Sequence, residues 1–242
     1  MSYSGHYPHP HKARERDRRA SRNLLALPIA LFFGFMLLAL IYVAYVLWPR
    51  WPAPVAEDAP SLPITVAGVT FNVPPAAIRV AVQRQPGPQE RIDLVFLWPS
   101  LSPPDPKAPS VPTAPGQTFD RMFLTVASAE GTLPPVDRFK TIYPRYLELQ
   151  IVSGPDGLAV RPFRDGSPYQ GEDLIYDPAA PEPFILRCSR NDTGATAGMC
   201  LYDRRIGGAD ITVRFPRNWL GEWRMVSRGI DRVIANMKPS AR

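Results

Sequence analysis

Two cysteines, Cys188 and Cys200, are the only thiols in the chain, and their chemistry depends on the residues around them. Eleven residues separate them, and two such ligands are too few for a zinc site. All three histidines, His6, His9 and His11, lie in the N-terminal tail, so none is available beside the cysteines to complete a metal site or a Cys–His nucleophile. The pair therefore predicts either a structural disulfide or a redox-active dithiol.

The local pattern favours the disulfide. Residues 183–188 and 199–202 have the apolar character of two short strands, and the loop between them is rich in Asn, Asp, Thr and Gly. Antiparallel pairing of the strands would set the cysteines opposite each other. A bridge closing a loop of this size contributes about 3 kcal/mol in the chain-entropy model. Besides arginines, nothing nearby would lower the pKa of a thiol, so the redox pair is the weaker alternative.

The most conspicuous carboxylates are Glu172 and Asp173, in the stretch GSPYQGEDLIYD. Two carboxylates that flank a glycosidic bond can hydrolyse it, so they are the candidate catalytic residues of a hydrolase. Adjacent acids in a loop of Gly, Ser and Pro more often form a solvated turn, and we expect no catalysis here. The stretch after the tail lacks histidine for a Ser-His-Asp triad and has no P-loop motif, and no cofactor or metal is expected.

Residues 24–48 form an uncharged stretch of 25 residues, LLALPIALFFGFMLLALIYVAYVLW. About 20 apolar residues cross the core of a bilayer as a helix, so this stretch predicts a transmembrane helix. Pro28 falls in its first turns, where the missing N–H costs least. A cleaved signal peptide would have an apolar region of about 7–15 residues followed by a small-x-small site, which favours an uncleaved anchor here.

Charges on either side of this stretch predict its orientation. Only Arg50 follows it closely, whereas six basic residues precede it: Lys12, Arg14, Arg16, Arg18, Arg19 and Arg22. Since positive residues stay in the cytoplasm, we expect a cytoplasmic N-terminus and a periplasmic C-terminal domain at the inner membrane. Disulfides form and persist in such an oxidising compartment.

Partners other than the lipid bilayer are predicted only weakly. The net charge of +6 reflects mainly the basic tail, so nucleic acid is not an expected partner. Ala26, Ala30 and Gly34 are spaced by four and would form a small-residue face for helix packing, with a second copy or with another membrane protein. Residues 187–242 hold eleven basic and five acidic residues, a surface that could meet anionic lipid or an acidic partner.

Composition divides the chain into four parts: a disordered basic tail (1–23), the transmembrane helix (24–48), a proline-rich spacer (49–61) and a periplasmic domain (62–242). The domain contains a proline-rich loop, 102–117. Its prolines fall three apart and would line one face of a polyproline II helix as a docking ridge: Pro103, Pro106, Pro109, Pro112 and Pro115. A solvated loop is the alternative.

The domain is expected to be α+β, mainly antiparallel sheet with a packed C-terminal helix. Alternating or apolar runs predict strands at 91–98, 122–127 and 210–215, and hairpins over 64–73, around Gly68, and over 146–163. The run at 91–98 is apolar on both faces and predicts a central strand. A short helix is expected at 134–143. An apolar stripe predicts the main helix over 219–237, with Asn218 as its N-cap.

These features lead to a first hypothesis of a single-pass inner-membrane protein. Its periplasmic domain would bind or scaffold a membrane or periplasmic protein of the envelope, without catalysis. The alternatives are a membrane-anchored periplasmic hydrolase that uses Glu172 and Asp173, and a binding module for a small ligand or a cell-wall polymer. An enzyme requires a concave pocket with converging polar groups, whereas a scaffold requires an exposed apolar or basic patch.

Overall fold

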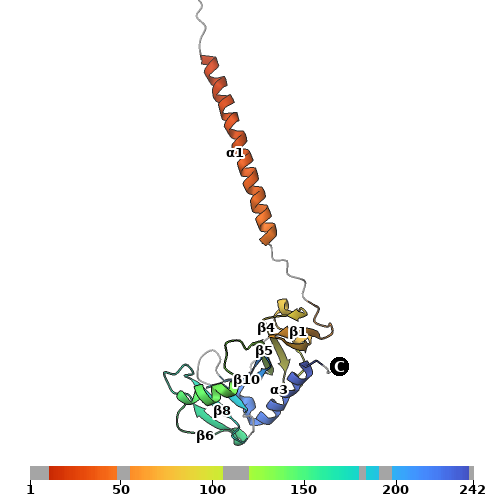
Figure 1. The fold of residues 1–242 in the computed structure, drawn as a ribbon, viewed down its shortest axis with the longest axis vertical. Helices are drawn as coiled ribbons and strands as arrows, with labels where there is room; N and C mark the ends of the chain where they lie inside the picture. Colours follow the sequence, from red (N-terminus) through yellow and green to blue (C-terminus); the bar gives the residue numbers. More distant parts are fainter. Residues whose placement is uncertain (1–10, 48–54, 106–119, 180–183, 191–197, 240–242) are drawn as a thin grey trace, which may run out of the picture. The chain divides into compact units, whose positions relative to one another are not determined.

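The computed structural model describes residues 11–47, 55–105, 120–179, 184–190 and 198–239. The chain divides into two compact units, Met1–Pro52 and Ala53–Arg242. Among the described residues, the first unit contains helix α1 (His11–Leu47) and the second contains the strands (Figure 1).

Helix α1 is long and apolar enough to cross a membrane: its Pro28–Leu47 stretch has a mean hydropathy of 2.5 and is unburied. The helix begins at His11, earlier than the transmembrane helix expected at residues 24–48, so it includes residues 11–23. Arg is frequent in that segment and, with Ala13, Ala20 and Glu15, favours helix, which lets the apolar helix extend toward the N-terminus. Pro28 consequently lies inside the helix and not in its first turns.

The second unit is an α+β domain built on two sheets, as the sequence predicts. The larger has eight strands in the order β4-β5-β11-β10-β9-β8-β7-β6, all antiparallel, and the smaller has the order β2-β1-β3. The strands are β1 (Leu62–Val66), β2 (Val69–Val73), β3 (Gly87–Pro88), β4 (Arg91–Leu97), β5 (Arg121–Ser128), β6 (Val152–Ser153), β7 (Ala159–Pro162), β8 (Glu172–Tyr176), β9 (Ile185–Ser189), β10 (Met199–Ile206) and β11 (Ala209–Pro216).

The helical elements of this unit are mostly short. They are η1 (Pro75–Ala77), η2 (Ala81–Gln83), α2 (Pro135–Asp137), η3 (Arg138–Ile142), η4 (Tyr143–Arg145), η5 (Pro155–Gly157), η6 (Arg217–Glu222) and α3 (Trp223–Met237). The helix predicted at 134–143 is present as the succession of α2, η3 and the start of η4, and Pro144 lies within η4.

Helix α3 provides one side of the main core. Its apolar stripe is buried in the same cluster as residues of both sheets: Trp223, Val226, Ile230, Val233, Ile234 and Met237. The predicted C-terminal helix is confirmed, but its start is not, because residues 217–222 form the 3₁₀ turn η6 and Glu222 occupies the N-cap. Asn218 is therefore not the cap. Contacts that Arg217 and Trp219 make elsewhere in the domain hold this tighter turn.

Alternation along the strands divides the buried residues between two clusters. Ile175 and Leu186 belong to the main core beneath α3, whereas Leu174 and Ile185, one residue earlier on the same strands, belong to a second cluster. Helical elements η3 and η4 contribute to this second cluster, and Tyr143 lies there at 3% exposure. The sheet is thus covered on both faces over strands β8 and β9.

The predicted hairpin over 146–163 is present only at its ends. Leu147 pairs with Phe163 and Val152 pairs with Val160, so the first strand has two more residues than its partner between these pairs. The surplus residues bulge from the sheet edge, and Leu149 is 94% exposed. A bulge of this kind protects an edge strand from pairing with another chain.

Two further features differ from expectation: the position of strand β4 in the sheet and the start of the domain. Strand β4 lies at the other edge of the large sheet and not at its centre. Its apolar residues are buried in the main cluster, and Leu94 forms an isolated β-bridge with Ile78. The domain also begins before residue 62. Val55 packs against the core, its N–H donates to the carbonyl of Arg84, and Glu57 forms an ion pair with Arg84 at 2.5 Å.

A row of polar residues crosses four strands on the face opposite α3. Asp93, Thr125, Thr212 and Asp203 are successive cross-strand partners, and the threonine hydroxyls donate to Asp93 and Asp203 at 2.9 and 2.7 Å. Burial raises the pKa of Asp93, but hydrogen bonds from Arg91, Thr125 and Gln83 outweigh it, so the net pKa lies below its usual value.

Asp210 has a similar environment two residues from this row. Burial raises its pKa, and hydrogen bonds from Arg205 and Thr132 more than offset that effect, so its pKa is also lowered. A carboxyl with a lowered folded-state pKa binds its proton more weakly in the folded than in the unfolded protein. Its contribution to stability is present above the unfolded pKa of about 4 and is lost as the pH falls through the folded value.

We therefore predict that the double variant Asp93→Asn/Asp210→Asn loses part of the acid sensitivity of the wild type. Urea unfolding of the full-length protein in mild detergent, at pH 7 and pH 3, measures this. The wild type should lose more free energy of unfolding between the two pH values than the variant. Asp58→Asn, at an exposed position, is the control and should behave as wild type. Equal losses in all three proteins would contradict the prediction.

Candidate binding groove on helix α3

The two acids considered as catalytic candidates, Glu172 and Asp173, do not lie in a loop; they begin strand β8 and point to opposite faces of the sheet. Glu172 forms an ion pair with Arg187 at 3.0 Å. Asp173 is 6% exposed and pairs with two arginines, Arg190 at 3.0 Å and Arg217 at 2.6 Å. The two carboxylates thus do not converge on one substrate-sized space, and each is bound to arginine.

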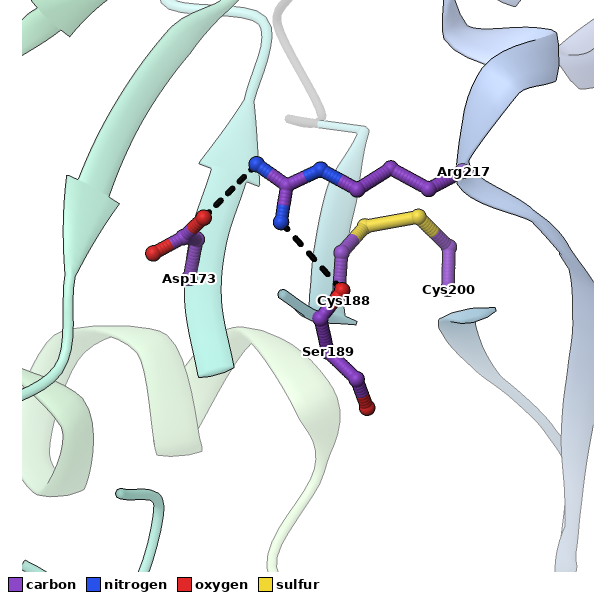
Figure 2. The surroundings of a disulfide bond; sticks show 5 residues. All are labelled: Asp173, Cys188, Ser189, Cys200 and Arg217. Carbon is purple, nitrogen blue, oxygen red and sulfur yellow. Dashed lines mark hydrogen bonds and ion pairs between the residues drawn. A yellow bond between two sulfur atoms is a disulfide. The ribbon is translucent and has the colours of Figure 1, made fainter. Parts of the chain in front are cut away.

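Asp173 lies beside the disulfide that Cys188 and Cys200 form, as the sequence predicts. The two cysteines are direct cross-strand partners on β9 and β10, both fully buried, and Asp173 is the partner of Cys188 on the next strand. Figure 2 shows Arg217 extending past the disulfide to Asp173, with a second hydrogen bond to the carbonyl of Ser189 at 3.3 Å. These contacts tie turn η6 to the sheet.

The same cross-strand row continues into an aromatic stack. Cys200 is the partner of Phe215 on β11, and the Phe215 ring stacks on Trp219 of η6 with centroids 6.0 Å apart. Trp219 in turn stacks on Trp98, at 5.1 Å. The disulfide holds the middle of this row, and the Asp173–Arg217 pair holds turn η6, which carries Trp219. Together they position Trp98 against helix α3.

Trp98 and α3 border a groove of about 200 Å³. Its floor and rim are formed by residues of the turn after β4 and of α3: Trp98, Pro99, Leu101, Met225, Arg228, Gly229 and Arg232. The turn is closed by hydrogen bonds from the Leu101 N–H to the Leu97 carbonyl and from the Leu97 N–H to the Ser102 carbonyl. Gly229 allows the close approach, since a Cβ there would lie 2.8 Å from the Trp98 ring.

Two arginines of the groove have no acidic partner within the part of the chain that the structure describes. Arg224 pairs with Asp156, and Asp231 pairs with Arg204, so the charges on either side of the groove are matched. Arg228 and Arg232, one helical turn apart, form no such pair among the described residues. Met225 is 45% exposed beside them. The groove thus combines an apolar floor with two unmatched positive charges.

The remaining predicted sites are only partly described. Ala30 and Gly34 lie exposed on α1, and Ala26 lies within the same helix. Pro103 is partly exposed, while Pro106, Pro109, Pro112 and Pro115 lie outside the described residues. Among the residues described, no three His, Cys, Asp or Glu side chains gather as a metal site.

The groove itself was not predicted from the sequence. The spacing of Met225, Arg228 and Arg232 places them together on the outer side of the predicted helix, and this was the available signal. Trp98 and Leu101 come from a segment more than a hundred residues earlier, and their approach to α3 follows from the sheet order and from Gly229.

Comparisons with known proteins leave the family open. No protein-family model matches the sequence, and no curated protein matches it. One solved structure with a similar chain path is Smlt3025, an immunity protein of the Stenotrophomonas maltophilia type IV secretion system. The two share 14% identity with a TM-score of 0.49, over 75% of this chain and 94% of the other. A likeness this distant carries no argument about activity or partners.

The disulfide is predicted to stabilise the domain by closing a loop in the unfolded chain. The double variant Cys188→Ala/Cys200→Ala should lose about 3 kcal/mol of unfolding free energy, measured by urea unfolding of the full-length protein in detergent. Reduction of the wild type should produce a comparable loss, and the variant, which has no thiols, serves as the control because a reductant should not affect it. A wild type that unfolds identically with and without reductant would contradict this.

We also predict that Gly229→Ala destabilises the domain by about 1–3 kcal/mol, because the new methyl group forces Trp98 away from α3 and disturbs its stack on Trp219. Thermal unfolding of the full-length protein measures the change. Gly221→Ala is the matched control, since a Cβ at Gly221 would meet nothing within 4 Å. A Gly229→Ala variant as stable as Gly221→Ala would show that Trp98 does not pack here as described.

Proposed function

We propose that this protein is a single-pass inner-membrane protein whose periplasmic domain binds or scaffolds a protein partner of the envelope, without catalysis. The observation that carries the proposal is the groove on α3, where unmatched Arg228 and Arg232 border an apolar floor. Exposed apolar surface beside unpaired charge is typical of a surface that a partner covers.

The size of the groove favours a protein partner over a small substrate. Pockets that enclose small molecules have volumes of roughly 300–1,000 Å³, and this groove has about 200 Å³. None of the described residues that line the groove is acidic, and the acids first considered for hydrolysis are bound to arginines on another part of the sheet. The groove residues therefore favour recognition over acid–base chemistry.

The proposed location is supported by two features of the chain. Helix α1 contains a 20-residue apolar stretch, Pro28–Leu47, and six basic residues precede that stretch, which favours a cytoplasmic N-terminus. The buried Cys188–Cys200 disulfide fits an oxidising compartment on the other side of the membrane. In this proposal the spacer after α1 joins the anchor to the periplasmic domain.

Two other surfaces belong to the same proposal. The small-residue face of Ala26, Ala30 and Gly34 would pack against a membrane-spanning partner or a second copy. The prolines between Pro103 and Pro115 would form a docking ridge if they adopt polyproline II. The groove is the best supported of the three surfaces, because the structure describes the side chains that line it.

The proposal predicts a reproducible partner that depends on the groove. Cells that express tagged full-length protein are cross-linked before lysis, and the protein is recovered in mild detergent for mass spectrometry. Arg228→Glu/Arg232→Glu should reduce recovery of the partner at least about tenfold, because a charge in a recognition surface then repels its counterpart.

A matched double charge reversal at exposed positions outside the groove, Lys140→Glu/Arg214→Glu, should leave recovery unchanged. Recovery of the wild-type protein alone would overturn the proposed function. An equal loss in both double variants would show that general charge, and not the groove, governs association.

A further inference from the structure

The groove on α3 has features that define the chemistry of what it binds. Its floor is apolar, formed by Trp98 and Leu101 from the turn after β4 and by Met225 from α3. Its volume of about 200 Å³ would hold a single large side chain and no extended ligand. Because Trp98 stacks on Trp219 and lies close to α3 at Gly229, this part of the floor is preformed.

The positive charges at the rim indicate which residues lie next to the side chain that the groove holds. Arg228 and Arg232 lie one turn apart on α3, so their Cα atoms are separated by about 6 Å along the helix axis. Guanidinium groups present several N–H donors in a plane that matches a carboxylate. Asp156 and Asp231 are already paired with Arg224 and Arg204, and no acid among the described residues forms an ion pair with Arg228 or Arg232, so the complement is sought outside the described residues.

We infer that the groove takes a segment of a partner protein in which one large apolar side chain stands next to acidic residues. The apolar side chain enters between Trp98 and Met225, and the carboxylates pair with Arg228 and Arg232. This inference rests on the proposed partner-binding function and adds the chemistry of the partner.

A bilayer surface is a less suitable occupant than a protein segment. Anionic headgroups could pair with the two arginines, but a flat surface of headgroups presents no single apolar side chain to fill a recess. Apolar anchors that fill a pocket inside a charged rim are a common arrangement at protein interfaces. The two occupants can be separated by experiment.

The test places a photo-cross-linking residue beside the groove of the full-length protein in its membrane. Ser100→p-benzoylphenylalanine, exposed beside the groove residues Pro99 and Leu101, leaves the groove lining unchanged, and Asn236→p-benzoylphenylalanine, exposed near the C-terminal end of α3, is the matched control. After irradiation, the peptide attached to the probe is identified by mass spectrometry. We expect the Ser100 probe, and not the Asn236 probe, to attach to one segment with an apolar residue within two positions of Asp or Glu.

Charge variants made in the probe-bearing protein provide the second measurement. Arg228→Glu/Arg232→Glu should reduce the cross-linked product at least tenfold. Arg228→Lys/Arg232→Lys keeps the positive charge but not the planar donors, and should give an amount of product between those of the wild type and of the Glu variant. A thermal unfolding curve of each variant shows whether a loss of product reflects a loss of folding.

Three outcomes would overturn the inference. They are attachment of the probe mainly to lipid, attachment to a segment without acidic residues, and no attachment at all. If one of these occurs while the chemical cross-linking of the whole protein still recovers a partner, the proposed function stands and only the chemistry assigned to the groove is wrong. If no partner is recovered by either method, both fail.

Discussion

The packing of α3 against the sheets is the constraint on which the rest of the domain depends. Trp223, Val226, Ile230 and Val233 are buried among strand residues of both sheets, so the helix joins the small sheet to the large one. Removing such large side chains from water stabilises the fold by about 1.5–3 kcal/mol each. Since the buried stripe leaves the opposite side of the helix in solvent, Met225, Arg228 and Arg232 are displayed together as a direct consequence.

The disulfide and its neighbouring ion pairs also position the groove, because they fix turn η6, which precedes α3. A single cross-strand row contains Asp173, Cys188, Cys200 and Phe215. The covalent bond fixes its middle, and the pair between Asp173 and Arg217 fixes the turn that carries Trp219. A buried carboxylate would be costly alone, and two arginines compensate it. The acid that first suggested catalysis thus has a structural role in positioning the groove.

Much of this fold follows from local patterns in the sequence, because alternation and apolar stripes report burial directly. The disulfide, the α+β class and the helix ending at Met237 are examples. What local patterns miss are features set by distant residues: η6 replaces the first turn of the expected helix because Arg217 and Trp219 bind elsewhere. The groove is also such a feature, since Trp98 meets Gly229 only through sheet order.

At the bulge around Leu149, the structure differs from the apolar pattern of the sequence for another reason. Leu147, Leu149 and Ile151 alternate as a strand does, yet only Leu147 is buried, and Ile151 is 57% exposed. A complete strand here would leave a long apolar edge open to pairing with other chains, and two surplus residues interrupt it. The groove differs from the bulge in having a concave floor and unmatched charges. Exposed apolar residues alone therefore do not identify a binding surface in this domain; their combination with Arg228 and Arg232 does.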